Sequence, residues 1–220
     1  MTAPARRLAG RVAVLGSPGS GKSAFCHALA RSGIPLFHLD DLYWGPGWQR
    51  TPDDEWRRTV TRLAADERWI VDGNHLGTIP ERLARAEIAV LLDPPALVCA
   101  WRVLRRSLRL RRRGADSGEY LPRQLGPQDK PVRDLSALLR KVTGFRRREL
   151  VATRPLLTGF AGRTVVCRTR RQTRRALSEL LPLLAACAPG PDAEPTSAGL
   201  SSCTCGGPTG TTAPHPVEEP

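Results

Sequence analysis

The residues with the clearest potential for chemistry form a short glycine-rich stretch, VLGSPGSGKS, at Val14 to Ser23. It places glycines, a lysine and a serine at the spacing G-x-x-x-x-G-K-S. In such a loop the glycines let backbone N–H groups turn inward around phosphate oxygens, lysine adds a positive charge, and the last hydroxyl holds magnesium. The alternative is an ordinary flexible turn. The predicted nucleotide-binding residues are Gly16, Ser17, Gly19, Ser20, Gly21, Lys22 and Ser23, with Ser23 also a magnesium ligand.

The elements around this loop are those that a phosphate-binding loop needs. Residues 11–15 form an apolar run typical of a strand, and residues 23–31 have a helical pattern that Gly33 ends. Further strands are predicted at 35–39, 68–71, 87–92 and 163–167. Helices are predicted at 52–67, 80–86, 96–113, 132–153 with a break near Gly144, and 170–186. Five short strands alternating with helices predict an α/β fold with a five-stranded parallel sheet.

Carboxylates follow several of the predicted strands. Asp40 and Asp41 come after the second strand, Asp72 ends the third, and Asp93 ends the fourth. Ligands of parallel α/β sheets bind at the carboxyl ends of the strands. We therefore expect these side chains and the glycine-rich loop to converge on one crevice.

Several longer stretches carry a resemblance to a known family. They are Gly16-Ser-Pro-Gly-Ser-Gly-Lys-Ser23, Leu39-Asp-Asp-Leu-Tyr-Trp-Gly-Pro-Gly-Trp48, Trp69-Ile-Val-Asp-Gly-Asn74, Arg82-Leu-Ala-Arg-Ala86 and Leu91-Leu-Asp-Pro94. On these residues the chain resembles the small adenylate-kinase-like P-loop kinases, and most closely their topology-modulation (FlaR-type) branch. The resemblance implies a P-loop NTPase three-layer fold of the nucleoside- or nucleotide-kinase type with an arginine-rich lid. It also implies ATP and Mg²⁺ as cofactors.

The resemblance assigns roles to four further residues. Asp72 matches the acidic residue that acts through water on magnesium, although it could also be a turn residue. Asp40 matches the carboxylate that orients or deprotonates the acceptor hydroxyl, with a helix cap as the alternative. Arg102 and Arg106 match the lid arginines that stabilise charge on the transferred phosphoryl group, whereas a solvated basic face is their alternative.

The acceptor pocket is less well defined by the resemblance. We expect Asp41, Trp44, Asn74 and Arg82 to line it. Trp44 and Trp48 flank a Gly-Pro-Gly turn, so they either stack on an acceptor ring or pack in the core or lid. His38 and His75 lie near strand ends, and we give neither a catalytic role. The T-G-D-x-x-R segment of AMP-using adenylate kinases is absent, and their D-G-F-P-R segment becomes Asp72-Gly-Asn-His75. AMP is therefore not the expected acceptor.

The positive charge of the chain supports a second hypothesis. The net charge is +13, and residues 95–175 hold 22 basic and 5 acidic side chains, a surplus of +17. Such a surplus fits a polyanionic partner. The leading hypothesis is an ATP-binding, magnesium-dependent phosphotransferase acting on a nucleotide, nucleoside or other small acceptor. The alternative is a nucleic-acid-associated ATPase or regulator of the DNA topology modulation type, which would contact nucleic acid through residues 95–175.

Length and composition complete the sequence-based expectations. A chain of 220 residues supports one substantial core. We expect a kinase-like domain at 1–187 with a mobile lid at about 111–131, followed by a disordered tail rich in Pro, Gly, Ser and Thr at 188–220. No long apolar run or secretory signal is present, so we expect a cytoplasmic protein with no membrane partner. Cys26, Cys99 and Cys167 lie in apolar segments and are expected to be buried thiols.

Overall fold

The computed structural model describes residues 10–113, 120, 122–125, 129 and 134–187. Of the predicted lid, residues 111–113, 120, 122–125 and 129 are described. The predicted tail, 188–220, lies outside the described residues. Within the described part of the chain, no helix is both long enough and apolar enough to cross a bilayer.

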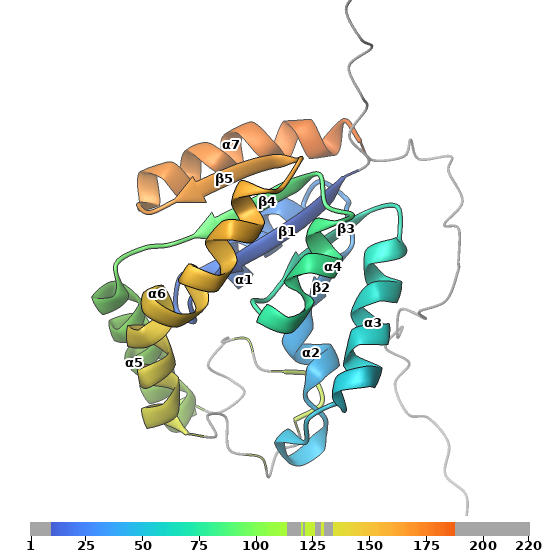
Figure 1. The fold of residues 1–220 in the computed structure, drawn as a ribbon. Coiled ribbons are helices and arrows are strands. Elements are labelled where there is room, and N and C mark those ends of the chain that lie inside the picture. The colour runs from blue at the N-terminus through green and yellow to red at the C-terminus, as the bar shows by residue number, and fades with distance from the viewer. Residues whose placement is uncertain (1–9, 114–119, 121, 126–128, 130–133, 188–220) are drawn as a thin grey trace, which may run out of the picture. The chain divides into compact units, whose positions relative to one another are not determined.

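Five parallel strands form one sheet in the order β2-β3-β1-β4-β5 (Figure 1). Their bounds are β1 Arg11–Gly16, β2 Leu36–His38, β3 Trp69–Asp72, β4 Ile88–Leu92 and β5 Arg163–Cys167. The central strands are nearly continuous apolar runs because both faces of a parallel sheet are covered. The predicted α/β fold with a five-stranded parallel sheet is confirmed. Since β1 lies between β3 and β4, the loop that follows it emerges at the middle of the carboxyl edge.

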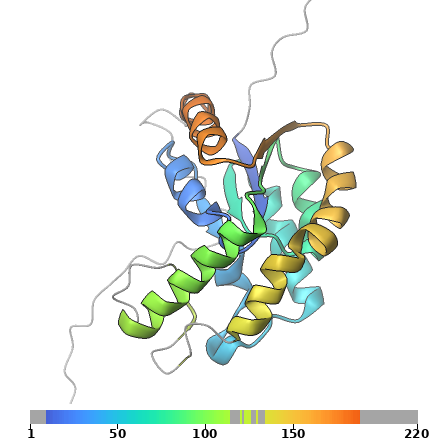
Figure 2. The same cartoon turned by 90° about the vertical axis from the view of Figure 1, so that its left-hand side faces the viewer.

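Helices cover both faces of this sheet, as Figures 1 and 2 show. Their bounds are α1 Lys22–Ala30, α2 Leu39–Tyr43, α3 Asp53–Ala65, α4 Ile79–Leu83, α5 Ala96–Arg113, α6 Leu135–Thr158 and α7 Arg170–Ala185, with short 3-10 turns at Pro46–Trp48 and Leu76–Thr78. Val12 and Val14 of β1 pack into a core with α1 and α7. Ala13 and Leu15, on the other face, pack into a core with α3, α4 and α6. The alternation of β1 side chains therefore joins the two layers.

The helix α6 differs from its prediction. It runs from Leu135 to Thr158 through Gly144 without the expected break, and Pro155 lies inside it. The Asp134 side chain caps its start by accepting a hydrogen bond from the N–H of Ala137. Glycine inside a helix costs about 1 kcal/mol relative to alanine. Burial of apolar side chains on both sides of Gly144, such as Val142 and Phe145, outweighs that cost.

Candidate functional site

The glycine-rich loop leaves β1 and is pressed closely by neighbouring backbone. Gly16 has a φ of 146°, and a Cβ there would lie 2.3 Å from the carbonyl oxygen of Leu92. Gly19 has a φ of 77°, and its Cβ would lie 2.5 Å from the carbonyl oxygen of Cys99. Both positions therefore require glycine. The loop delivers the chain into α1, whose first N–H groups have no partner within the helix and favour an anion.

Two polar side chains of this loop, Lys22 and Ser20, could contact a bound anion. The Nζ of Lys22 donates a hydrogen bond to the carbonyl oxygen of Ser17 at 3.0 Å. The hydroxyl of Ser20 is buried, and none of the described residues is its hydrogen-bond partner. Leaving a buried hydroxyl unpaired is unfavourable, so it marks a place where a ligand oxygen would be stabilising.

The carboxylate of Asp72 connects the loop to the end of β3. Its Oδ2 accepts a hydrogen bond from the Ser23 hydroxyl at 2.7 Å and lies 2.9 Å from Nδ1 of His38. Its Oδ1 and the Nε2 of His38 are both buried and have no hydrogen-bond partner in the described part of the chain. The structure therefore brings together the two residues predicted to hold magnesium, and it adds a histidine that the sequence analysis left without a role.

Asp40 and His75 form a second pair at the same edge of the sheet. Nε2 of His75 lies 3.1 Å from Oδ1 of Asp40. Partial desolvation would raise the pKa of Asp40, but the hydrogen bond and charge of His75 and the charges of Lys22 and Lys141 outweigh it, so the pKa is lowered. The side chain of Asp40 is still 53% exposed. It is thus an ionised carboxylate that a substrate can reach.

His75 itself is held in a strained conformation. Its φ of +23° is uncommon for a residue other than glycine. Its ring packs against the rings of Tyr43 and Trp56, with centroids 4.6 and 4.9 Å away. These aromatic contacts fix the imidazole that in turn orients Asp40.

Arg82 is completely buried and donates hydrogen bonds to the backbone of residues 73–75. Its guanidinium donates to the carbonyl oxygens of Gly73 at 2.8 Å, Asn74 at 2.8 Å and His75 at 3.3 Å. Burial lowers the pKa of Arg82 to about 10, so the side chain stays charged at neutral pH. None of its surface is open to a substrate in this conformation. The geometry therefore gives Arg82 the task of positioning the 73–75 loop, in place of the direct acceptor contact predicted for it.

Asn74 links the glycine-rich loop to α6. Its Oδ1 accepts a hydrogen bond from the N–H of Gly16 at 3.3 Å, and its Nδ2 donates to Oε2 of Glu149. The other oxygen of Glu149 lies 3.8 Å from Nζ of Lys141. Glu149 was not predicted. It is the only acidic residue of α6, which has six basic ones. A single carboxylate in so basic a helix could have marked Glu149 as a candidate site residue.

The predicted lid arginines lie on α5 beside the loop. Arg102 donates hydrogen bonds to the carbonyl oxygens of Gly19 at 3.3 Å and Ser20 at 3.2 Å. Arg106 donates to the carbonyl oxygen of Tyr120 at 3.2 Å. Both guanidinium groups therefore lie toward the site, which distinguishes them from the exposed arginines of the same helix.

Asp41 anchors the described lid residues to α2. It accepts a hydrogen bond from the Tyr120 hydroxyl at 2.7 Å and another from the N–H of Arg123 at 2.8 Å. Burial, followed by the contact with Asp41, raises the pKa of Tyr120, so the phenol stays protonated. The Tyr120 ring lies 4.5 Å from that of His38. Asp41, predicted to bind substrate, thus contacts two of the described residues of the predicted lid, and its contact with a substrate stays a prediction.

Trp44 packs against other aromatic rings, in agreement with the alternative interpretation that it has a packing role. Its ring lies edge-on to those of Tyr43 at 4.8 Å and Trp48 at 5.4 Å, and it remains partly exposed. Both tryptophans thus belong to the aromatic cluster next to His75. Their contact with an acceptor stays a prediction.

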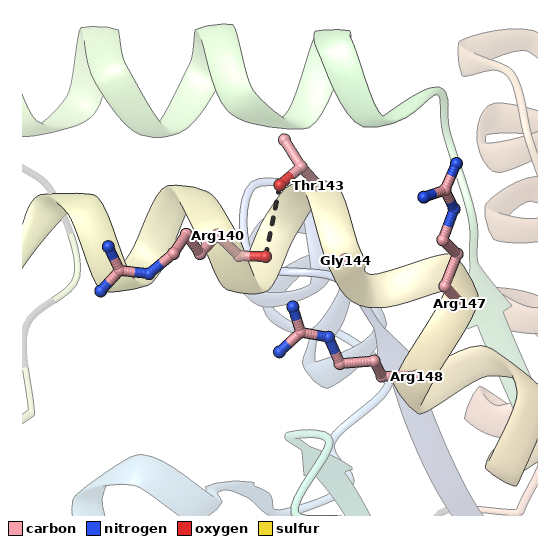
Figure 3. A pocket seen from close by; sticks show the side chains of 5 residues that line it. All are labelled: Arg140, Thr143, Gly144, Arg147 and Arg148. Carbon is pink, nitrogen blue, oxygen red and sulfur yellow. Dashed lines mark hydrogen bonds between the residues drawn. The ribbon is translucent and has the colours of Figure 1, made fainter.

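Two further features are the buried cysteines and an indentation on α6. Cys26, Cys99 and Cys167 are buried free thiols, as predicted, and burial raises the pKa of each. An indentation of about 400 Å³ opens on α6, lined by Arg140, Thr143, Gly144, Arg147 and Arg148 (Figure 3). None of the predicted site residues lines it. In the described residues no cluster of three or more His, Cys, Asp or Glu is arranged to hold a metal ion.

Comparison with known proteins gives likenesses at the level of the fold. No family model and no curated protein matches the chain. Among solved structures, a gluconokinase from Sinorhizobium meliloti 1021 shares 22% identity, with 83% of this chain and 93% of that chain covered and a TM-score of 0.43. A shikimate kinase from Acinetobacter baumannii shares 18%, covering 80% and 92%, with a TM-score of 0.43. One from Bacteroides thetaiotaomicron shares 17%, covering 80% and 98%, with a TM-score of 0.45. These similarities are too distant to carry an argument about function, and the resemblance to topology-modulation proteins stays a prediction.

Proposed function

We propose that the chain is an ATP- and Mg²⁺-dependent phosphotransferase that acts on a small acceptor. One observation carries the proposal: the loop from Gly16 to Ser23 lies at the middle of the carboxyl edge of the sheet, with Lys22 across it and the Ser23 hydroxyl bonded to Asp72. This arrangement offers a helix N-terminus, an ammonium group and a hydroxyl–carboxylate pair to one triphosphate.

The residues present fit a magnesium ion. Mg²⁺ prefers oxygen ligands, keeps several waters, and needs one or two carboxylates besides the substrate phosphates. Ser23 supplies a hydroxyl oxygen, and Asp72 supplies a buried Oδ1 that has no hydrogen-bond partner among the residues that the structure describes. We assign Ser23 as a ligand and Asp72 as a residue that acts through water. When bound, Mg²⁺ neutralises charge on the phosphate oxygens.

Asp40 is the group that we assign to the acceptor hydroxyl. It is ionised, reachable by solvent and held by His75. A carboxylate in that state can orient a hydroxyl and accept its proton as the hydroxyl oxygen bonds to the transferred phosphorus. Asn74, Glu149 and Lys141 extend the same edge with polar groups, so the acceptor we expect is small and polar: a nucleotide, nucleoside or other hydroxyl compound.

We assign to Arg102 and Arg106 the role of stabilising the negative charge on the phosphoryl group during its transfer. Guanidinium groups stabilise a migrating phosphoryl group because its negative charge is spread over three oxygens. Their present partners are backbone carbonyl oxygens, which a phosphate can replace. The Tyr120 and Asp41 contact holds the described lid residues next to these arginines, so opening that contact would admit substrates.

Screening purified protein with ATP, Mg²⁺ and a panel of nucleosides, nucleotides and polyhydroxy compounds tests the proposal. Transfer of the γ-phosphoryl group to one class of acceptor is the expected result. Absence of transfer with retained ATP hydrolysis on DNA would instead favour the nucleic-acid-associated ATPase. DNA affinity would then fall by about 10³ or more between 50 and 200 mM salt.

A further inference from the structure

The outward side of α5 carries an exposed apolar stripe. Leu97, Trp101, Leu104 and Leu108 recur at the spacing that places them on one face of a helix. Their exposed fractions are 81%, 59%, 41% and 46%. The opposite side of α5 is buried through Cys99, Val103 and Leu110, of which the first two pack on Val142 of α6. Figure 2 shows α5 extending away from the sheet with α6 beside it. The helix therefore has two apolar sides, and one of them faces solvent.

Arginine is the only charged residue type of α5. The sequence of the helix, ALVCAWRVLRRSLRLRRR, has seven arginines and no acidic residue. Arg105, Arg111 and Arg112 are exposed. The guanidinium of Arg105 lies 5.3 Å from the centroid of the Trp101 ring. The exposed stripe thus has a cationic border.

We propose that this face of α5 docks on an anionic lipid surface. A helix with leucine and tryptophan on one face and arginine along its border lies in the plane of a membrane interface. The apolar side chains enter the acyl boundary, while the long arginine stems let their charged heads reach lipid phosphates. The proposal departs from the sequence-based expectation of no membrane partner, which rested on the lack of a long apolar run and of a secretory signal. Interfacial docking needs neither.

The charges argue against the other occupants of this face. A second copy of the chain would bring two arginine borders together, and like charges repel. A nucleic acid would satisfy the arginines and could stack on Trp101, but it would leave three exposed leucines without apolar partners. A lipid surface satisfies both the charge and the apolar side chains.

Docking by the stripe is compatible with the site described above. Cys99, Arg102 and Val103, which lie on other sides of α5, are the residues next to the glycine-rich loop. Binding through Leu97 and Trp101 therefore requires no rearrangement of that loop. The proposal does not depend on phosphotransferase activity, and its test needs no acceptor.

Co-sedimentation of the full chain with vesicles is the test. Vesicles contain phosphatidylcholine alone or with about a third phosphatidylserine, because the charged headgroup supplies the attraction. We expect binding only to the anionic vesicles, weakening between 50 and 300 mM salt as the Debye length shortens. The double variant Leu97→Gln/Trp101→Gln should bind at least tenfold more weakly. The matched control is Val151→Gln on α6, where an equally exposed apolar side chain, 60% exposed, is changed and binding should persist.

Circular dichroism checks that the double variant is folded, which is expected since both side chains are exposed. Brominated acyl chains should quench part of the tryptophan fluorescence of the wild type, and Trp101→Phe should remove that part. The proposal is overturned if anionic vesicles do not bind. It is also overturned if the double variant binds as the wild type does, or if the stripe governs self-association or single-stranded DNA binding while vesicles fail to sediment the protein.

Discussion

The Ser23 hydroxyl donates a 2.7 Å hydrogen bond to Asp72, a residue 49 positions further along the chain. This bond joins the start of α1 to the end of β3, and it does so where β1 and β3 pair in parallel. Because Oδ2 of Asp72 is shared by Ser23 and His38, its orientation is fixed and Oδ1 remains available. The pair is thus organised before any nucleotide binds.

The first prediction concerns this pair. Asp72→Asn keeps the shape of the side chain but removes its charge, so we expect a higher Mg²⁺ requirement and a loss of ATP turnover of about 10²-fold or more. Titration of turnover against Mg²⁺ is the measurement. Asp53→Asn at the exposed start of α3 is the control and should leave the Mg²⁺ curve unchanged. An unchanged Mg²⁺ curve in Asp72→Asn would show that Asp72 is only a turn residue.

A second prediction separates ATP binding from phosphoryl transfer. Asp40→Asn should bind ATP with nearly wild-type affinity, because Asp40 is assigned to the acceptor, while transfer falls by about 10²- to 10⁴-fold. Calorimetry gives the first quantity and acceptor phosphorylation the second. Asp54→Asn, an exposed carboxylate of α3, serves as the control. Near wild-type transfer in Asp40→Asn would reduce Asp40 to a structural cap.

The pH dependence of activity provides a third prediction. The pKa of Asp40 is lowered, so the carboxylate stays ionised as the pH falls through the usual carboxyl range. His75→Asn removes the charge of the histidine while keeping a residue type that tolerates positive φ. The pKa of Asp40 should then rise, and the acidic limb of kcat/KM should move to higher pH. In His27→Asn the limb should stay in place; an unmoved limb in His75→Asn would disconnect the two residues.

The contact between Asp40 and His75 also makes the stability of the fold depend on pH. A carboxyl whose pKa is lower in the folded state stabilises the fold above its unfolded pKa, and this contribution is lost as the pH falls through the folded pKa. Since half of the Asp40 side chain is exposed, solvent screening makes the contribution small. The effect on catalysis should therefore exceed the effect on stability.

The fourth prediction tests the buried arginine. Arg82→Met removes a guanidinium that satisfies the carbonyl oxygens of Gly73, Asn74 and His75, so we expect a loss of about 3 kcal/mol or more in the free energy of unfolding. Urea denaturation measures it. Arg57→Met, whose side chain is 62% exposed, should cost less than about 1 kcal/mol. Equal midpoints for the two variants would contradict the positioning role of Arg82.

The sheet could be predicted from the sequence because each strand is recognised from residues that are contiguous in the chain. Strands β1, β3 and β4 are short apolar runs that end at Gly16, at Asp72 and just before Asp93, and the residues from Gly16 to Ser23 are contiguous in the chain. The structure confirms the five parallel strands. The expected break at Gly144 is wrong because burial of the residues around it, which propensity does not register, keeps α6 continuous.

Side-chain partnerships could be predicted only in part. The convergence of Asp40 and Asp72 follows from their places at strand ends, but their pairing with His75 and His38 depends on rotamers and on the strained backbone at His75. Arg82 shows the same limit: it was expected to line the acceptor pocket, whereas its side chain is completely buried and donates to backbone carbonyl oxygens. The hydrogen-bond partner of each of these polar side chains is therefore set by tertiary packing.

Calorimetric titration of Mg²⁺–ATP into the wild type and into Lys22→Ala tests the central claim most directly. We predict one nucleotide site per chain in the wild type and a loss of affinity of about 10²-fold or more in Lys22→Ala, since the ammonium group and the loop amides act on the same phosphates. Arg62→Ala, which removes an exposed cation of α3, should leave the affinity unchanged. A wild type that binds no nucleotide, or a Lys22→Ala variant that binds it equally well, would contradict the account.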